Sequence, residues 1–422
     1  MHPFRNVLYA VVLSLAVASF ADAQRTALPP TVSDSAGIRL VVNATPTSIA
    51  ATIAASPMVE IGGGGDPAAD LSLVAAAVRL GDGRIAIAEQ STRSIKIFDA
   101  RGRFVRAIGR QGQGPGEFAA ITRLQLLRGD SIVAYDAVRG TLAVFDTTGR
   151  LGRTNRVVSG MGGLQLVGLL GNGTMVMTRS YNPNFGSASK LERDAITYVT
   201  TSPGSTTIDT IMTVPGTEIF LYAGTDFSSR NPLPFGRTSF AAVQDDRIIV
   251  ASGDAWQVEV RSPAGALREI HRVRHQPIAV TRSDIAQYRK DLIERLRGVR
   301  MTATGGSAAD MPGRIAQQER MLDLVPYPDT HAPYDSLIVG AEGEVWVRSA
   351  GIPAGRPRNW VVLSRTGAAL GTVSVPARTR LLQVGREFVV AVRKDEEDVE
   401  HVGLYALRRV GARGENQGQG SP

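Results

Sequence analysis

The sequence predicts an all-β fold, a six-bladed β-propeller whose last blade is closed by a strand from near the N-terminus. Three observations support this prediction: an internal repeat, short alternating strands separated by tight turns, and an unmatched strand near the start of the chain. The repeat is formed by residues 61–102 and 108–149, which align without a gap at an offset of 47 residues. A period of about 40–50 residues that holds about four strands is typical of a propeller blade.

The two copies of the repeat share their apolar positions and their turns. Ile95-Lys-Ile-Phe-Asp99 in the first copy matches Leu142-Ala-Val-Phe-Asp146 in the second. We expect the equivalent Phe98 and Phe145 to face the apolar layer between blades. The acid that ends each motif lies at the turn that follows. Within the first copy, the alternation of apolar and polar residues predicts strands at Arg84–Ala88, Ile95–Asp99 and Phe104–Ile108.

Four weaker copies follow the same order of strands and turns. Second strands are predicted at Arg84–Ala88, Ser131–Tyr135, Thr174–Thr178, Arg247–Ala251, Glu344–Arg348 and Glu387–Val392. Third strands are predicted at Ile95–Asp99, Leu142–Asp146, Ile196–Thr200, Gln257–Arg261, Trp360–Ser364 and Gly403–Leu407. Five fourth strands follow near Phe104, Leu151, Thr206, Leu267 and Leu370. The sixth copy lacks a fourth strand, and we expect Met58–Gly62 to supply it, because ring closure protects strand edges that would otherwise be exposed.

The two ends of the chain differ from the repetitive body. Met1–Ala23 has the pattern of a secretory signal peptide, with an apolar run and Ala21-Asp-Ala23 as a cleavage site. Residues 24–56 are an N-terminal segment, residues 57–410 form the predicted propeller, and residues 411–422 form a polar tail that we expect to be disordered. We therefore expect a periplasmic or secreted protein with no membrane span once the signal is removed.

The composition limits the chemistry that the chain can use. It contains no cysteine, which excludes disulfides, a cysteine-ligated zinc or iron–sulfur site and a cysteine nucleophile. Lys and Arg number 47 against 39 Asp and Glu, a net charge of +8, and only four of the basic residues are lysines. The arginines are spread along the chain without a basic block or a nucleic-acid-binding motif, so we expect no nucleic-acid partner.

Part of the chain resembles a known repeat family. The motifs Gly83-Arg-Ile-Ala-Ile-Ala-Glu89, Ile95–Asp99, Gly102-Arg-Phe-Val-Arg-Ala-Ile-Gly109 and Gly112-Gln-Gly-Pro-Gly-Glu-Phe118 resemble an NHL repeat. The resemblance covers about 90 residues, and the sequence departs from the family pattern at residues 119–127. It implies a six-bladed propeller of the kind found in exported bacterial proteins. That family spans scaffolds, sensors, lyases and lactonase-like enzymes, so the resemblance implies a fold and not a reaction.

Four long insertions interrupt the predicted blades. In a four-stranded blade, the loops between second and third strands and the crossings between blades share one face of the disc, and every insertion belongs to these classes. We therefore expect them on one face, either as a cap over the channel mouth or as a binding surface. The insertions are Arg179–Ala195, Val214–Thr238, Gln276–Asp335 and Ser349–Asn359.

The largest insertion, about residues 276–335 between blades 4 and 5, is predicted to be partly helical. Thr281-Arg-Ser-Asp284 resembles a capping box, and the apolar residues that follow step by three and four positions. A second short helix is expected at about Pro312–Leu324. We expect the apolar stripe to pack on the propeller face, with a partner-binding or membrane-surface helix as the alternative. The stripe consists of Ile285, Tyr288, Leu292, Leu296 and Val299.

The predicted binding face carries arginines and aromatic residues from several insertions. We expect a basic rim there that recognises a protein partner or an anionic or carbohydrate-like ligand, because each guanidinium offers a planar fork for carboxylate or phosphate. The alternative is that these arginines pair with local acids, namely Glu192, Asp194, Glu218 and Asp226. The candidate ligand-binding residues are Arg179, Tyr181, Phe185, Tyr222, Arg230, Arg237, Arg356 and Arg358.

Metal and catalytic motifs are sparse in the sequence. His271 and His275 could join His331 or His401 in a metal site, but exposed histidines on an outer strand explain them as well. For the equivalent acids Glu89 and Asp136, the family resemblance implies that they cap loops, with a cation site as the alternative. We predict no cofactor and leave calcium or zinc open. The pattern favours a non-catalytic binding or scaffold propeller over the alternative, a metal-assisted lyase or lactonase-like hydrolase with its site at the channel mouth.

Overall fold

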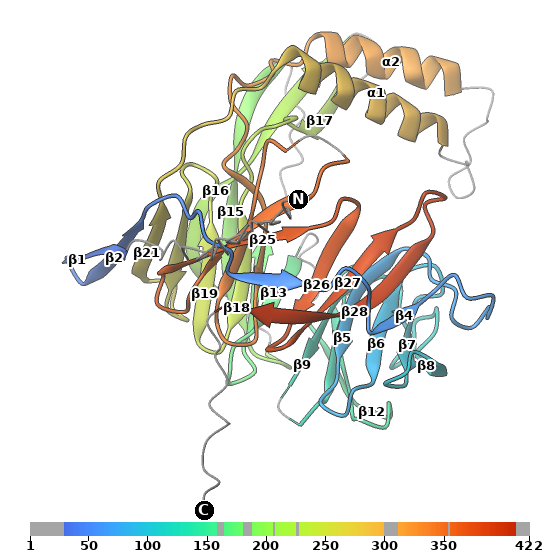
Figure 1. Cartoon of the computed structure of the whole chain (residues 1–422). Helices are drawn as coiled ribbons and strands as arrows, with labels where there is room; N and C mark the ends of the chain where they lie inside the picture. The colour runs from blue at the N-terminus through green and yellow to red at the C-terminus, as the bar shows by residue number, and fades with distance from the viewer. Residues whose placement is uncertain are drawn as a thin grey trace, which may run out of the picture.

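The computed structural model describes residues 29–127, 129–157, 164–179, 188–205, 207–224, 228–298, 311–352 and 355–410 (Figure 1). The predicted signal peptide and the predicted polar tail lie outside these residues. Six sheets follow one another along the chain, and within each the blade's own strands pair antiparallel in sequence order. The first strand of the last blade lies beside the first strand of the first blade, so the blades close into a ring. The all-β, six-bladed architecture predicted from the repeat is confirmed.

The blades have the following strands. Blade 1 contains β5 (Val74–Arg79), β6 (Ile85–Glu89), β7 (Ser94–Phe98) and β8 (Phe104–Ile108). Blade 2 contains β9 (Ile121–Leu126), β10 (Ile132–Asp136), β11 (Thr141–Phe145) and β12 (Leu151–Arg156). Blade 3 contains β13 (Leu164–Leu169), β14 (Met175–Arg179), β15 (Lys190–Thr201), β16 (Asp209–Ala223) and β17 (Ser228–Pro232). Blade 4 contains β18 (Phe240–Gln244), β19 (Arg247–Ala251), β20 (Gln257–Arg261) and β21 (Leu267–Val273). Blade 5 contains β22 (Tyr334–Val339), β23 (Val345–Ser349), β24 (Arg358–Leu363) and β25 (Ala369–Val375), and blade 6 contains β26 (Thr379–Val384), β27 (Phe388–Lys394) and β28 (Glu400–Arg409).

The N-terminal part of the chain closes the last blade, as the sequence predicted. The strand β4 (Val59–Ile61) pairs antiparallel with β28, with Ile61 opposite Val402. A second short strand, β3 (Ala51–Ile53), also pairs with β28, further along the same edge. The outer edge of blade 6 is therefore covered by residues that come before blade 1 in the chain, which joins the two ends of the ring.

Upstream residues that we treated as a plain N-terminal segment also form strands. The hairpin β1 (Thr31–Ser35) and β2 (Ile38–Asn43) extends blade 4, with β2 running parallel to β21. Between β2 and β3, the chain exchanges two backbone hydrogen bonds of 2.9 Å with Thr372 in blade 5. Residues 38–61, called the N-terminal strap below, thus cross the outer edges of blades 4, 5 and 6 in turn.

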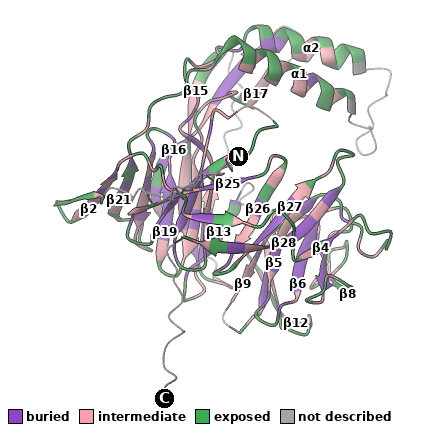
Figure 2. Cartoon of the chain, viewed as in Figure 1, coloured by how far each residue is buried: buried purple, intermediate pink, exposed green. Residues whose placement is uncertain are grey.

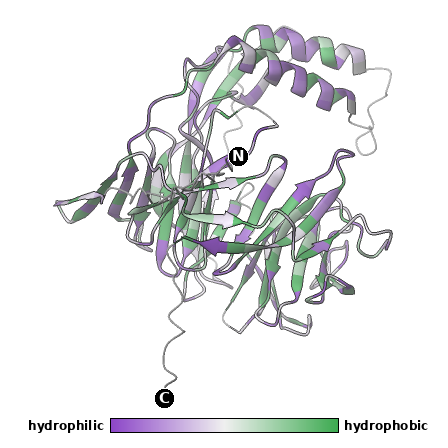
Figure 3. Cartoon of the chain, in the orientation of Figure 1, coloured by the Kyte–Doolittle hydropathy of each residue, from purple (hydrophilic) through white to green (hydrophobic). Residues whose placement is uncertain are grey.

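The apolar core lies between neighbouring blades. Phe98 is fully buried and packs among residues of blades 1 and 6, whereas Phe145 is 2% exposed and packs between blades 1 and 2. Buried and hydrophobic residues follow the blade strands in Figures 2 and 3, whereas the outer surfaces of the helices are exposed and hydrophilic. The expected position of both phenylalanines in the layers between blades is confirmed.

In their described residues, the first two predicted insertions consist largely of strands rather than loops. β15 and β16 pair along nearly their whole lengths, and β17 adds to the free edge of β16. Pro215 lies opposite Ala195 at a register shift in this ladder, which lets a residue without an N–H remain in it. The extension that projects from blade 3, residues 190–194 and 217–235 apart from 225–227, is called the arm below.

The helical insertion forms α1 (Arg282–Gly298) and α2 (Met311–Asp323), close to the predicted positions. Thr281 and Asp284 form the predicted capping box, because each donates its backbone N–H to the other's side chain, at 2.8 and 3.1 Å. Neither of the helices in the described part of the chain is long and apolar enough to span a membrane.

The apolar stripe of α1 packs differently from our expectation. Tyr288 and Leu292 join a cluster with Phe220 and Leu233 of the arm and with α2, rather than lying flat on the propeller disc. Figure 1 shows both helices held away from the blades at the far end of β15 and β16. The expectation was wrong because the arm, which the sequence did not reveal, offers an apolar surface nearer to the helices. Val299 lies outside the described residues.

Candidate ligand-binding site

The repeated acids of the first two blades cap loops, as predicted. Glu89 accepts the backbone N–H of Ser72 at 3.0 Å, and Asp136 accepts that of Ala119 at 2.6 Å, so each acid bonds the residue 17 positions earlier. Burial acts to raise the pKa of Glu89, but hydrogen bonds from Ser91, Thr92 and Lys96 lower it overall. Each carboxylate therefore fixes the loop that leads into the first strand of its own blade.

The histidines take structural positions that differ from our expectation. We expected His271 to be exposed on an outer strand, but it is fully buried, because β2 of the N-terminal strap covers it. Its Nε2 lies 2.8 Å from Glu269, and burial lowers the pKa of its imidazole although Glu269 acts in the opposite direction. His401 contacts Asp395 at 2.9 Å in blade 6. Among the described residues, no three His, Asp or Glu side chains are grouped so that they could hold a metal ion.

Two arginines of the predicted basic rim are held by local acids. Arg230 contacts Glu192 at 3.0 Å and also Asp194, and its side chain is only 11% exposed. Arg237 donates to Glu218 at 2.7 Å, and this ion pair helps to hold the pKa of Glu218 below its usual value despite burial. For these two residues the structure thus favours the alternative that the sequence left open, namely pairing with local acids.

The other predicted rim residues come from different elements. Arg179 ends β14 and Tyr222 lies in β16, and both are half-buried. Arg356 is exposed, whereas the half-buried Arg358 donates to the carbonyl of Ile352. Tyr181 and Phe185 lie outside the described residues. A single rim of free arginines is therefore not what the described part of the chain presents, and ligand binding by these residues remains a prediction.

Two cavities meet beneath the arm and α1, and together they are called the cleft below. One has a volume of about 620 Å³ and the other about 780 Å³. Both are lined by Phe235, His331 and Ala332. Residues of all four predicted insertions contribute to these walls, since Leu191 and Ile352 come from the first and the last of them. The prediction that the insertions come together is confirmed for their described parts.

Phe235 is the centre of the cleft. Its ring lies 5.0 Å from His331, 5.6 Å from Tyr288 and 6.2 Å from Tyr327, measured between ring centroids. Its φ is +62°, a left-handed conformation that a bulky side chain rarely adopts and that costs of order 1–3 kcal/mol. Its carbonyl accepts the backbone N–H of Ala332 at 3.0 Å. A strained backbone that places one aromatic ring between two cavities is a feature more often found at functional sites than in plain packing.

The smaller cavity is lined by one face of α1. Asp284, Gln287, Tyr288 and Asp291 follow one another at intervals of three, one and three residues, so they share that face. The pKa of Asp284 is lowered chiefly by its hydrogen bonds from Thr281, so this carboxyl group is ionised at neutral pH. The opposite wall includes the first residues of blade 5, among them the fully buried Tyr334.

The larger cavity has both apolar and charged walls. Trp256 and Tyr327 contribute aromatic surface, four prolines line part of the wall, and charged side chains such as Asp254, Arg274 and Asp329 line other parts. Burial lowers the pKa of His275, which also lines it. The ion pair between Arg237 and Glu218 stands at its margin, where the two charges are largely occupied with each other. This cavity is suited to the apolar part of a ligand.

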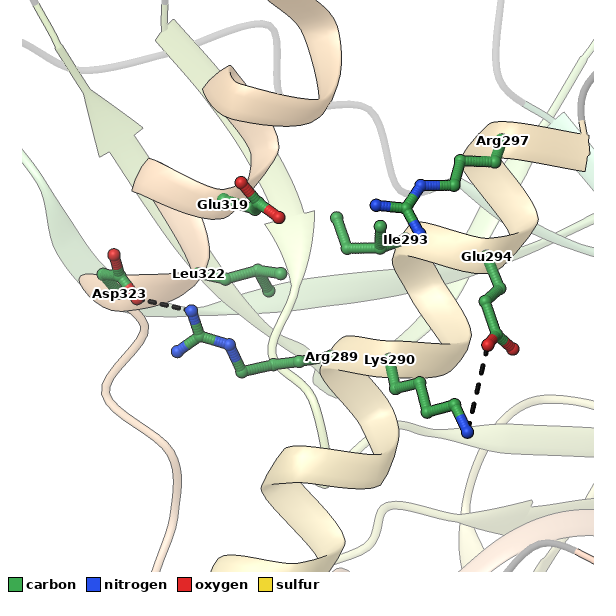
Figure 4. A pocket seen from close by; sticks show the side chains of 8 residues that line it. All are labelled: Arg289, Lys290, Ile293, Glu294, Arg297, Glu319, Leu322 and Asp323. Carbon is green, nitrogen blue, oxygen red and sulfur yellow. Dashed lines mark hydrogen bonds and ion pairs between the residues drawn. The ribbon is translucent and has the colours of Figure 1, made fainter. Parts of the chain in front are cut away.

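A separate groove lies between the two helices (Figure 4). Its volume is about 510 Å³, and its charged side chains mostly pair with one another. Arg289 of α1 contacts Asp323 of α2, and Lys290 lies 3.9 Å from Glu294. The groove is therefore better explained as the seam that holds α1 and α2 together than as a second site.

Comparisons with known proteins agree with this architecture. A family model described as a 6-bladed beta-propeller matches residues 71–158. The chain is a six-bladed β-propeller. A search of curated proteins found no match.

Several solved structures are similar to the chain. A protein of Bacteroides fragilis described as exported is 11% identical, with a TM-score of 0.47, and the match covers 88% of this chain and 99% of that one. A member of the DUF4221 family from Bacteroides vulgatus is 10% identical, with a TM-score of 0.48 and coverages of 86% and 99%. A gluconolactonase of Xanthomonas campestris is 12% identical, with a TM-score of 0.38 and coverages of 86% and 99%. Likenesses at this level carry no argument about ligand or activity.

Sequence reasoning did not assign the main residues of the cleft to a site. Phe235 and Asp291 were not singled out, Asp284 was assigned only to the capping box, and Tyr288 only to the apolar stripe. His331 was considered only as a metal ligand. The sequence contained one signal of a site: Asp284 and Asp291, seven residues apart, lie on the same helical face on either side of Tyr288. That pattern indicated a site only once the arm had placed Phe235 opposite the helix.

Proposed function

We propose that this chain is a non-catalytic, extracytoplasmic binding protein, periplasmic or secreted, that takes a small ligand in the cleft between its arm, α1 and blades 4 and 5. The observation that carries the proposal is the position of Phe235, strained in backbone and shared by two cavities. Cavities of about 620 and 780 Å³ are in the range of small-molecule sites. The signal-like start of the sequence supports the location.

The walls of the cleft support a ligand that is partly apolar. Aromatic side chains surround Phe235, while polar groups come from α1 in the smaller cavity and from the arm and blade 4 in the larger one. A few oriented polar groups within an aromatic pocket are the usual composition of a site that fixes one orientation of its ligand. The strain at Phe235 persists because the hydrogen bond to Ala332 and the packing of neighbouring rings hold it in place.

The proposal is tested by blocking the cleft from the helix side. Gln287 is exposed and lines the smaller cavity, so Gln287→Trp should fill that cavity without disturbing the core. Ala286→Trp is the matched control, since Ala286 is the exposed neighbour on α1 that lines neither cavity. Each full-length protein is incubated with a low-molecular-mass extract of bacterial periplasm, and bound compounds are identified by mass spectrometry.

We expect at least one compound to be enriched on the unmodified protein and on Ala286→Trp but lost from Gln287→Trp. A second blocking variant, Ala332→Trp, acts from the wall that both cavities share. Circular dichroism and thermal unfolding establish that each variant is folded. If the three tryptophan variants and the unmodified protein retain the same compounds, the cleft is not the binding site.

A further inference from the structure

The smaller cavity is anionic although the chain as a whole is basic. Its lining holds the three carboxylates of Asp284, Asp291 and Asp335 against the one guanidinium of Arg358. Asp335 is already paired with Arg348, which lies outside the lining. The lining then retains two carboxylates, both from α1, against the one guanidinium of Arg358, so its remaining charge is negative. This sign is opposite to that required by the anionic ligand predicted from the sequence.

The two carboxylates stand at opposite ends of one helical wall. Asp284 and Asp291 are seven residues apart, so they lie on the same face of α1, about 10 Å apart along the helix axis. Tyr288 lies between them on that face, and Phe235 packs against its ring at 5.6 Å between centroids. The wall thus presents an acid, an aromatic surface and a second acid in line.

A buried ring nitrogen of His331 lies beside the first acid, Asp284. Nε2 of His331 has no hydrogen-bond partner among the described residues, and the side chain is only 8% exposed. The atom lies 3.5 Å from Oδ2 of Asp284. With its proton on Nδ1, the ring can accept a hydrogen bond at Nε2 from a ligand N–H; with its proton on Nε2, the ring donates toward Asp284. Since a buried polar atom without a partner is unfavourable, a ligand N–H at this position satisfies Nε2 in the first of these two forms.

The second acid is also available to a ligand. Asp291 accepts a hydrogen bond of 2.6 Å from Gln287, which leaves its charge unneutralised. No basic side chain within the ranges described pairs with it. The carbonyl oxygen of the Gln287 amide is a second acceptor at this end of the wall.

We infer that the cleft binds a linear diammonium ligand, with one ammonium group at Asp284 and His331, the other at Asp291, and the chain between them along Tyr288 and Phe235. The inference rests on the proposed function and specifies its ligand class. Each ammonium group donates charge-assisted hydrogen bonds to a carboxylate. The rings attract the cations through their faces and provide apolar surface for the methylene groups.

The test compares three probes of equal chain length by isothermal titration calorimetry on the full-length protein at low salt. The probes are 1,8-diaminooctane, 1-aminooctane and 1,8-octanediol. Asp291→Asn removes the second charge but retains an oxygen that can accept the hydrogen bond from Gln287. Glu294→Gln is the matched control, because it removes one acid from the same helix at the groove between α1 and α2 (Figure 4), outside the cleft.

We expect the diamine to bind about tenfold or more tightly than the monoamine, the effect of one additional charge-assisted contact. In Asp291→Asn this advantage should fall below about threefold, while Glu294→Gln should retain it. The inference is overturned if the diamine binds no more tightly than either other probe, or if none of the three binds. It is also overturned if the advantage of the diamine over the monoamine is unchanged in Asp291→Asn. If the monoamine or the diol binds equally well and Gln287→Trp abolishes that binding, only the charge assignment fails, and the cleft remains the ligand site.

Discussion

The replacement of Phe145 by alanine measures how much of the stability of the propeller lies in the layers between blades. Phe145 is the last residue of β11, is 2% exposed, and packs its ring 6.1 Å from that of Phe118. Its neighbours come from blades 1 and 2, so the side chain fills a space that neither blade encloses alone. Truncation leaves a cavity that the rigid sheets on both sides can close only in part.

The expected loss of stability is large enough to measure easily. Truncation of a buried phenylalanine costs about 3–5 kcal/mol, which includes the transfer of the ring and the cavity left behind. The unfolding entropy is about 2.1 cal/mol/K per residue, or roughly 0.8 kcal/mol/K for the folded body of about 380 residues between β1 and β28. The melting temperature should therefore fall by about 4–6 °C.

The control is the acid that follows the phenylalanine. Asp146 is exposed and accepts backbone hydrogen bonds from Thr148 and Arg150 at 2.8 and 2.9 Å, which close the turn to β12. In Asp146→Ala the freed N–H groups can bond to water, so the melting temperature should fall much less. Differential scanning calorimetry measures the melting temperature of both variants and of the unmodified protein. Comparable losses in Phe145→Ala and Asp146→Ala would refute the placement of Phe145 in the layer between blades.

The other two predictions concern closure of the ring and its dependence on pH. Removal of residues 24–62 takes away β3, β4 and the rest of the N-terminal strap, so the protein should aggregate or lose its cooperative unfolding transition; a truncated protein with unchanged solubility and stability would contradict the closure. The folded-state pKa of Glu89 lies below its unfolded value, so its contribution is full above about pH 4.5 and is lost as pH falls through the folded value. Glu89→Gln should therefore lower stability at pH 7 and weaken its decline between about pH 5 and 3; parallel pH profiles from urea unfolding would contradict this.

The repeat pattern was sufficient to predict the blades because each blade is built from local contacts. The strands at 84–88 and 95–99 were predicted within one residue, since each is a short apolar run bounded by turn residues and both are buried along their whole length. The capping box at Thr281 was equally local, because its two partners are three residues apart. The closure by residues 58–62 followed from counting strands, since a ring with five complete blades and one short blade requires an additional strand.

The candidate site could not be derived in the same way. Phe235 follows a proline and precedes a glycine, which indicated a loop, and its position between two cavities depends on the arm that holds it. For Arg230 and Arg237 the sequence left open a basic rim or pairing with local acids, and the arm decides for pairing because it brings acids from β15 and β16 to them. His271 was expected to be exposed, and it is buried only because residues more than 200 positions earlier in the chain cover it.

The sequence by itself determined the class of fold, the number of blades, the strand that closes the ring and the helical insertion. These features follow from hydrophobic periodicity and turn chemistry, which act over a few residues and are therefore visible in the order of the residues. Only the tertiary structure decided which charges are paired, which histidine is buried, and that one acidic face of α1 lies opposite Phe235 across a cleft. Those relations join segments tens to hundreds of residues apart. They depend on where the arm and the N-terminal strap lie, which is set by strand pairing and packing that no local pattern encodes.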